Sequence, residues 1–272
     1  MASESIDFQL ALQAAKEAAN RGREILKKYF GNLSNVDEKH QAGLVTEADV
    51  NSEKAIISFL KGEFPNLGFL AEESSYLDST EGQQSHHAGR WIIDPLDGTT
   101  NFVHRFPIFC ISIGLEWKNE IVVGLIDVPI LNDTYWAIKG QGAFKNGKPI
   151  HVSHTAVLKE ALLATGFSVH KPNALEQQLQ IFTHLIRESR GVRRAGAAAF
   201  DLCMVAEGIF DVFWERDLSP WDVAAGALIV REAGGTVTDF SGQRHTPYMP
   251  NILASGPNIH QTMVNHIGSV SS

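Results

Sequence analysis

The stretch from Trp91 to Asn101 places the strongest constraint on how this chain can fold. Its first three residues, Trp-Ile-Ile, are bulky, partly β-branched and uncharged, which is typical of the end of a buried strand. Pro95 has no N–H to donate, so we expect it to stop the sheet ladder. Gly98 and the two threonines after it supply a flexible turn and helix-capping residues. The stretch therefore predicts a strand, a sharp turn and a short helix.

This junction places two carboxylates, Asp94 and Asp97, at the carboxyl end of the predicted strand, with free backbone N–H groups just behind them. Carboxylates bind hard cations, and helix N-termini bind phosphate. A carboxylate at the end of a buried strand needs a partner, because an unpaired buried charge is costly. One short segment could therefore hold both a metal ion and an anion.

The composition bounds the class of protein. The chain has 272 residues, 44% of them hydrophobic, which is enough for one large layered domain or two closely joined lobes. Lys and Arg total 23 and Asp and Glu total 31, a formal charge of −8. This acidity argues against a general nucleic-acid or membrane-surface binder, and we expect neither partner.

Three features favour a cytoplasmic location. Cys110 and Cys203 lie far apart in sequence and in no paired motif, so we interpret them as small core residues in a reducing compartment. The first residues lack a basic region followed by an apolar core, which argues against a secretory signal. No uncharged apolar run approaches the ~20 residues that a bilayer span needs.

The first half of the chain predicts helices followed by consecutive hairpins. Residues 7–30 have the spacing of an amphipathic helix, and a capping box at Thr46–Asp49 opens a second helix, with a polar loop between them. A short strand at 69–71 ends at two glutamates, and a polar segment, 77–89, is predicted to be a loop. Short turns then separate strand-like runs, which imply an antiparallel sheet at residues 110–117, 121–128 and 134–138.

The second half alternates between strands and helices, which predicts an α/β lobe. The predicted strands are 161–165, 191–194, 211–215, 236–240 and 252–255. The predicted helices are 175–187, 197–206, 221–231 and 259–267. No repeat or Pro/Ser-rich linker separates the halves, so we predict one domain with an α+β lobe at 1–152 and an α/β lobe at 153–272.

Acids recur at the ends of predicted elements: Glu72 with Glu73, Asp94 with Asp97, and Asp222. Taken singly, some have simpler interpretations, since Asp222 suits the first turn of a helix. Acids that converge from separate elements would repel one another, and divalent cations would remove that repulsion. Oxygen-only ligands favour Mg²⁺ or Mn²⁺ over zinc, and a pair of such ions can activate water for phosphoryl transfer.

Several motifs resemble the inositol monophosphatase family, in the family's order and with similar spacing over nearly the whole chain. Residues Asp94–Thr99, with Trp-Ile-Ile before them, resemble its first signature, and Trp221–Gly226 with Glu232–Gly235 resembles its second. Ala71–Ser74 resembles the family's acidic pair, and Leu44–Asp49 resembles its N-terminal threonine-aspartate element.

This resemblance implies a layered αβαβα sandwich and a Mg²⁺-dependent, lithium-sensitive phosphomonoesterase with two or three ions, for which Mn²⁺ could substitute. Under it, Glu72, Asp94 and the carbonyl of Leu96 would bind the first ion. Asp94, Asp97 and Asp222 would bind the second ion, with Asp94 bridging, and Glu72 would assist a third, weaker site.

The same resemblance assigns the reacting groups. Asp49 and Thr99, with Glu72, would orient and activate the attacking water, and Gly98 and Thr99 would hold phosphate. The alcohol would be contacted through its hydroxyl groups by Gly196, Ala197, Ala198 and Glu215. Family members are commonly homodimers, which implies a homodimer here.

The predicted substrate is a small phosphorylated polyol, first of all myo-inositol monophosphate. Glu215 favours a neutral polyol, because a carboxylate accepts hydroxyl hydrogen bonds and repels a second phosphate. Related members hydrolyse fructose-1,6-bisphosphate, histidinol phosphate or other sugar phosphates, and Arg193-Arg194 could bind a second phosphate. These substrates stay open as alternatives.

Two rival phosphate chemistries fit the sequence less well, and one non-enzymatic role stays open. Haloacid-dehalogenase phosphatases use Asp-x-Asp, whereas Asp94 and Asp97 stand three apart, which favours activated water over an aspartyl-phosphate. The segment 142–148 imitates a nucleotide P-loop, but Pro149 replaces its Ser or Thr, so we predict a hairpin. The third alternative is a regulatory protein-binding module.

Overall fold

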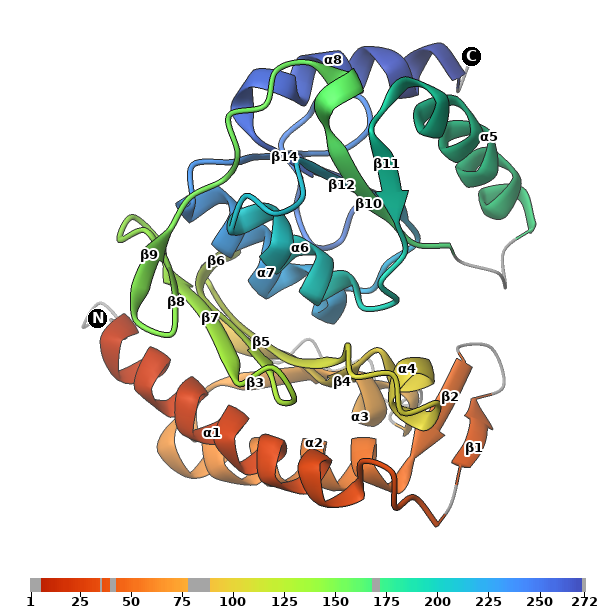
Figure 1. Ribbon diagram of the computed structural model, residues 1–272. Coiled ribbons are helices and arrows are strands. Elements are labelled where there is room, and N and C mark those ends of the chain that lie inside the picture. The colour runs from red at the N-terminus through yellow and green to blue at the C-terminus, as the bar shows by residue number, and fades with distance from the viewer. Residues whose placement is uncertain (1–5, 35, 40–42, 78–88, 168–171, 271–272) are drawn as a thin grey trace.

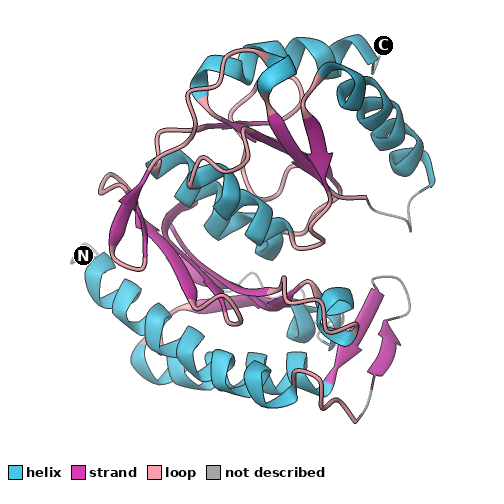
Figure 2. Cartoon of the chain, viewed as in Figure 1, coloured by secondary structure: helices cyan, strands magenta, loops and turns pink. Residues whose placement is uncertain are grey.

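A computed structural model describes residues 6–34, 36–39, 43–77, 89–167 and 172–270 of the chain. The predicted polar loop at 77–89 therefore lies almost wholly outside the described residues. Most of the described elements stack in five layers, in which the two larger sheets alternate with three layers of helices (Figures 1 and 2). This is the layered αβαβα arrangement that the family resemblance implies, and it is confirmed. None of the described helices is both long and apolar enough to cross a membrane.

Two helices, α1 (Phe8–Tyr29) and α2 (Glu47–Glu63), form the first layer beneath the larger sheet (Figure 1). The first begins at Asp7, whose carboxylate accepts hydrogen bonds from two backbone N–H groups of the first turn. The second begins with the predicted capping box, in which the Thr46 N–H donates to Asp49 Oδ2 at 2.9 Å. Both helices bury their apolar stripes against the sheet in one continuous core.

The larger sheet has seven strands that are neighbours in chain order. They are β3 (Gly68–Ala71), β4 (Gly89–Asp97), β5 (Cys110–Trp117), β6 (Glu120–Val128), β7 (Asp133–Ile138), β8 (Ala143–Lys145) and β9 (Lys148–Ile150). Only β3 and β4 pair in parallel, so the predicted antiparallel sheet is confirmed for the hairpins. Asn146 and Gly147 join β8 to β9 with positive φ at both residues, as a tight hairpin turn requires, so the P-loop-like segment is a hairpin.

Helices α6 (Ala198–Ala206) and α7 (Pro220–Glu232) form the middle layer between the two sheets (Figure 1). Helix α7 lies very close to β6, because a Cβ at Gly124 would fall 2.8 Å from the carbonyl oxygen of Ala225. The hydroxyl of Ser112 on β5 also donates to the carbonyl of Trp221 at 2.9 Å. The middle layer is therefore fixed to the larger sheet by backbone contact as well as by apolar packing.

The second sheet has five strands in the order β11-β10-β12-β14-β13. They are β10 (Leu162–Thr165), β11 (Gly191–Arg193), β12 (Val212–Arg216), β13 (Thr236–Thr238) and β14 (Asn251–Ser255). Strand β10 pairs in parallel with β11 and β12, and β14 is antiparallel to both its neighbours. A 3₁₀ turn, η1 (Leu158–Glu160), precedes this sheet, and α5 (Pro172–Glu188) and α8 (Pro257–Val270) cover its outer face. The lobe boundary at residue 152 stays a prediction.

The structure differs from the sequence-based expectations at three places. A hairpin of β1 (Val36–Lys39) and β2 (Gly43–Thr46) occupies part of the predicted polar loop. A short helix, α3 (Glu72–Leu77), follows β3 directly. Pro95 does not stop β4, which continues to Asp97, because the proline lies where the strand's register shifts and no ladder N–H is needed there.

Candidate active site

The irregular end of β4 places both of its acids on one face of the sheet. Asp94 pairs with Ser112 of β5, and Asp97 pairs with Cys110. An advance of three residues along β4 therefore matches an advance of only two residues along β5. In a regular strand, residues three apart point to opposite faces. The extra residue of this bulge turns Asp97 back to the face of Asp94. The strand end therefore presents a pair of carboxylates instead of a single one.

Each of these carboxylates accepts a hydrogen bond from a neighbouring backbone N–H. Asp94 is buried, and its Oδ1 accepts from the N–H of Leu96 at 2.9 Å. Asp97 Oδ2 accepts from the N–H of Ala199 at 2.7 Å, and Ala199 lies in the first turn of α6. The N-terminus of a helix favours a negative charge. The middle layer therefore helps to hold an acid of the larger sheet.

Asp222 and Glu72 approach the same place from two other helices. Asp222 lies in the first turn of α7, where its Oδ2 accepts from the N–H of Ser219 at 2.7 Å in a capping box. Glu72 is the first residue of α3, directly after β3, and is half-buried. The acids thus come from elements far apart in sequence, and each one is positioned by the start or end of an element.

The electrostatics show that these acids act on one another. Burial, followed by the charges of Glu72, Asp97 and Asp222, raises the pKa of Asp94 well above its ordinary value. Burial, followed by the charges of Asp97 and Glu72, raises the pKa of Asp222 in the same way. Burial also raises the pKa of Asp97 to about 7, although the N–H of Ala199 opposes this rise. Ionised carboxylates that repel one another in this way are unfavourable. This set of acids therefore calls for a positive charge.

We tested whether this acid set fits a metal ion. Among the described residues, no three Asp, Glu, His or Cys side chains already have the spacing of a metal site. However, Asp94 Oδ2 and Asp222 Oδ1 accept no hydrogen bond from any described residue, so each keeps an oxygen available to a cation. An all-oxygen donor set with mutual repulsion suits a hard divalent ion such as Mg²⁺. The residues therefore fit the ion once their carboxylates turn toward it.

A hydroxyl and a fifth acid lie beside this set. The Thr99 Oγ1 is 3.0 Å from Asp49 Oδ1 and 3.1 Å from the Leu96 carbonyl oxygen, both within hydrogen-bond distance. The other oxygen of Asp49 accepts from the Thr46 hydroxyl at 2.6 Å as well as from the Thr46 N–H. The capping box thus fixes the carboxylate of Asp49, which in turn orients the hydroxyl of Thr99. Two of the three residues that the resemblance assigns to water activation, Asp49 and Thr99, are therefore in contact.

The predicted short helix after Gly98 is confirmed as α4 (Thr99–Val103). Gly98 is its N-cap with a φ of 91°, a left-handed conformation that favours glycine. No side chain caps this end, so the first N–H groups of α4 stay available to an anion. The side chain of Asn101 donates to the carbonyls of Ile108 and Ala195, which ties α4 to the segment before α6.

The residues predicted to contact the alcohol border a small cavity of about 130 Å³ next to Asp97 and Asp222. It is lined by Thr165, Gly166, Arg194, Gly196, Ala197, Ala198, Asp201, Glu215 and Leu218 as well as those two acids. Burial raises the pKa of Glu215 to about 8, the charge of Arg194 lowers it, and that of Asp97 raises it. The structure thus brings Glu215 and the start of α6 together, although they come from different elements.

Sequence reasoning missed one acid of this cavity, Asp201. It lies in the first turn of α6, a segment for which the sequence analysis predicted a helix and no role for this acid. The signal was present, because a single carboxylate interrupts the apolar run Ala197–Ala206. Cys110 and Cys203 are free and buried, which confirms them as core residues.

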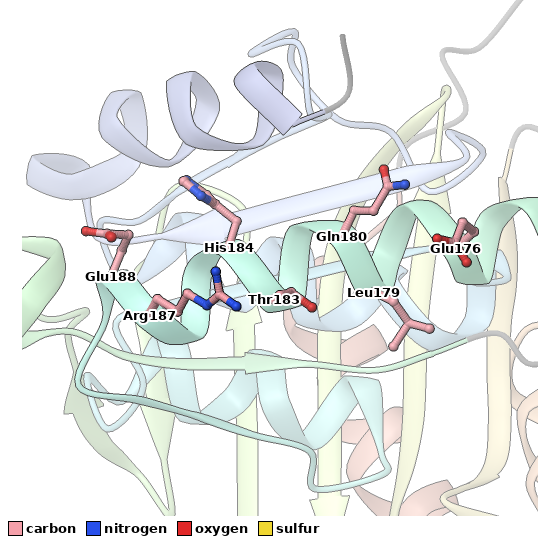
Figure 3. Close-up of a pocket in the computed structure, with 7 residues that line it drawn as sticks. All are labelled: Glu176, Leu179, Gln180, Thr183, His184, Arg187 and Glu188. Carbon is pink, nitrogen blue, oxygen red and sulfur yellow. The ribbon is translucent and has the colours of Figure 1, made fainter.

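A larger hollow, about 480 Å³, lies on the outer layer and does not share these features. The seven side chains that line it all come from α5, as Figure 3 shows, and include Glu176, Arg187 and Glu188. His184 lies on the side of α8, where its Nε2 is 2.8 Å from Nδ1 of His266. A hollow on one helix, remote from the acids, is not the candidate active site.

Comparison with known proteins agrees with this arrangement of acids and layers. The model of the inositol monophosphatase family matches residues 7–271. The chain belongs to the inositol monophosphatase family. It is therefore a phosphatase of the inositol monophosphatase type, that is, a phosphoric monoester hydrolase.

Relatives of this family member carry several names. An inositol-1-monophosphatase of Synechocystis is 40% identical over 94% of this chain and 88% of its own length. A putative Nus factor SuhB of Neisseria meningitidis is 39% identical over 95% of this chain and 98% of its own. A fructose-1,6-bisphosphatase/inositol-1-monophosphatase of Aquifex aeolicus is 42% identical over 84% of each chain.

Solved structures of the family share the fold. The extragenic suppressor protein suhB of Bartonella henselae superposes with a TM-score of 0.87 at 38% identity, over 95% of this chain and 98% of its own. An inositol monophosphatase from Anabaena gives 0.86 at 37% identity, over 97% of this chain and 98% of its own. The layered arrangement is therefore the family's own.

Proposed function

We propose that this phosphatase hydrolyses a small phosphorylated polyol in a Mg²⁺-dependent reaction, with myo-inositol monophosphate as the first candidate substrate. The observation that carries the proposal is the convergence of Glu72, Asp94, Asp97 and Asp222 beside the start of α4. Acids that raise one another's pKa values need a cation, and the N-terminus of a helix favours an anion. The site could therefore hold a metal ion and the phosphate group of the substrate side by side.

The proposed ligands are those that the family resemblance assigns, and the mutual repulsion of the acids among them supports the assignment. Glu72, Asp94 and the Leu96 carbonyl would hold one ion, and Asp94, Asp97 and Asp222 would hold another. Two ions are proposed, with a third, weaker one near Glu72, and Mn²⁺ as a substitute. Bound Mg²⁺ would supply Lewis-acid stabilisation of phosphoryl charge and lower the pKa of nearby water.

The chain's own residues would then position the attack. Thr99 donates its proton to Asp49, so a lone pair of its hydroxyl oxygen is left for a hydrogen bond from water. Asp49 accepts this hydrogen bond in a fixed orientation, because its other oxygen already accepts from the N–H and the hydroxyl of Thr46. The N–H groups of Gly98 and Thr99 would hold phosphoryl oxygens. Gly196, Ala197, Ala198 and Glu215 would contact the alcohol, because they line the adjoining cavity.

The decisive experiment is a phosphate-release assay of the purified protein on myo-inositol 1-phosphate, fructose-1,6-bisphosphate, histidinol phosphate and other sugar phosphates, with Mg²⁺ or with EDTA. We expect release from the inositol ester only when Mg²⁺ is present, and inhibition by lithium. The relative named fructose-1,6-bisphosphatase/inositol-1-monophosphatase makes the bisphosphate a second candidate substrate. Faster turnover of the bisphosphate at equal concentration would replace the inositol assignment.

A second candidate function is regulatory binding to another protein, because one relative is named a putative Nus factor. A protein that releases no phosphate from any of these esters in Mg²⁺ would favour this function over hydrolysis. By family likeness we also propose a cytoplasmic homodimer without nucleic-acid or membrane partners. A monomeric mass by light scattering would contradict the dimer.

A further inference from the structure

The cavity beside Asp97 contains a buried carboxylate oxygen without a hydrogen-bond partner among the described residues. Asp201 is only 1% exposed, and its Oδ1 has no hydrogen-bond partner among the described residues. A buried carboxyl without partners costs stability. Cores rarely keep such a group unless it binds something. Asp201 borders the cavity that the alcohol of the substrate would enter.

Two other ionisable groups line this cavity and form no side-chain hydrogen bond or ion pair with the described residues. Glu215 is buried, and its carboxylate accepts no hydrogen bond from the described residues. The guanidinium of Arg194 has no carboxylate within ion-pair distance in the described part of the chain, although the charge of Arg194 acts on both acids. Two acceptor groups and one donor group thus face a single cavity with their hydrogen-bonding capacity unused.

The backbone around the cavity is shaped to admit these side chains. A Cβ at Gly166 would fall 2.2 Å from Oε1 of Glu215, so only glycine lets that carboxylate lie there. Gly196 has a φ of 87°, and a Cβ on it would fall 2.6 Å from a terminal nitrogen of Arg194. Glycine at both positions gives Glu215 and Arg194 room against the main chain. The cavity is therefore built around charged groups.

We propose that Asp201 is a specificity-determining residue, which together with Glu215 and Arg194 binds two adjacent hydroxyl groups of the alcohol. A hydroxyl both donates and accepts, so a neighbouring pair can donate to the two carboxylates and accept from the guanidinium. Two carboxylates in the cavity also repel a second phosphate, in spite of Arg194. The inference rests on the proposed function and narrows its substrate class to a vicinal diol monophosphate.

The test compares two substrates in one enzyme. Myo-inositol 1-phosphate carries adjacent hydroxyl groups, whereas p-nitrophenyl phosphate carries none. We expect Asp201→Asn to lower the ratio of their kcat/KM values about tenfold, because the amide no longer offers two equivalent acceptor oxygens. We also expect its Tm to stay equal or rise, because the unpartnered carboxylate is gone. An unchanged ratio overturns the proposal, and so does a lowered Tm with equal losses on both substrates.

A matched control is Asp211→Asn. Asp211 is also a buried Asp of the second half, but it is fully partnered, by the hydroxyl of Ser153 at 2.5 Å and the N–H of Leu162 at 2.6 Å. We expect this variant to lower Tm and to leave the substrate ratio within about twofold. A shift of the ratio as large as that of Asp201→Asn would show that the effect is a general consequence of core damage and would overturn the proposal.

A binding measurement separates this inference from the proposed function. Titration calorimetry with myo-inositol 1-phosphate and Mg²⁺ reports binding even when no phosphate is released. If the wild-type protein binds the ester without hydrolysing it, and Asp201→Asn weakens binding about tenfold, the hydrolytic function fails and this inference stands. If the wild-type protein does not bind the ester, the inference fails as well. If it hydrolyses the ester while Asp201→Asn changes neither binding nor the ratio, only the inference fails.

Discussion

Replacement of Glu215 by glutamine should stabilise the metal-free protein in a pH-dependent way. Glu215 is buried and accepts no hydrogen bond from the described residues. Burial raises its pKa from an ordinary 4.5 to about 8, with Arg194 lowering and Asp97 raising it. Between these two values the folded protein binds more protons than the unfolded chain, so the free energy of unfolding falls as pH rises. Glutamine carries no such charge and removes this dependence.

The magnitude follows from the two pKa values. Their difference corresponds to a ceiling of about 5 kcal/mol above pH 8, at roughly 1.4 kcal/mol for each pH unit. Water that enters the cavity screens the charge, so we expect about 2 kcal/mol in practice. At about pH 4 the two proteins should differ little, because the carboxyl group is then largely protonated in both the folded and the unfolded state.

Urea denaturation in EDTA at several pH values, from about 4 to about 9, measures this difference. Glu116→Gln is the matched control, because Glu116 is equally buried but accepts from Arg90 at 2.7 Å and from Tyr248 at 2.8 Å. Glu116→Gln should lose about 1 kcal/mol, because a neutral amide accepts more weakly from the partly exposed Arg90 and from Tyr248. The reasoning is refuted if Glu215→Gln is less stable than the wild type at high pH, or if its gain does not change with pH.

Three further predictions concern activity. Asp94→Asn should lower Mg²⁺-dependent phosphate release at least ~10³-fold in the colorimetric assay, since Asp94 would be a ligand of both ions. A loss of about tenfold or less would exclude this role. Thr99→Val should lower kcat about 100-fold with little change in KM, because Asp49 then has no hydroxyl to orient. A kcat within about threefold of the wild-type value would contradict this role. Gly166→Ala should raise the KM for myo-inositol 1-phosphate about tenfold, because its Cβ would displace Glu215; an unchanged KM would show that the cavity does not hold the alcohol.

The regular elements could be predicted because local patterns determine them. The capping box at Thr46, the strand Cys110–Trp117 and the turn at Asn146-Gly147 each carry their own signal, and all are confirmed. Pro95 misled us because the rule that proline ends a strand holds for regular ladders, and here the register shift removes the need for its N–H. The hairpin β1–β2 lies in polar sequence that offers no alternating apolar pattern to detect.

The site was predicted in part for the same reason. The shared role of Thr99 and Asp49 followed from the family resemblance, and the structure shows them in contact. The hydrogen bond from Ala199 to Asp97 depends on how the middle layer packs, which no local pattern shows. Asp201 was missed because the residues that line the same cavity, Glu215 and Arg194, come near it only in the folded chain. Sequence spacing reveals acids on one segment, but tertiary packing decides which of them share a cavity.

Most residues proposed for bond cleavage lie in other elements than those proposed to recognise the alcohol, and this has an evolutionary consequence. The acids of β4, the hydroxyl of Thr99 and the start of α4 belong to the larger sheet's side. The groups that would recognise the alcohol, Glu215 and Asp201, come from β12 and α6. If the proposed roles hold, substitutions of Glu215 or Asp201 would change the preferred alcohol and leave the proposed metal ligands, Asp222 of α7 included, in place. A lineage built this way could acquire new substrates by single substitutions.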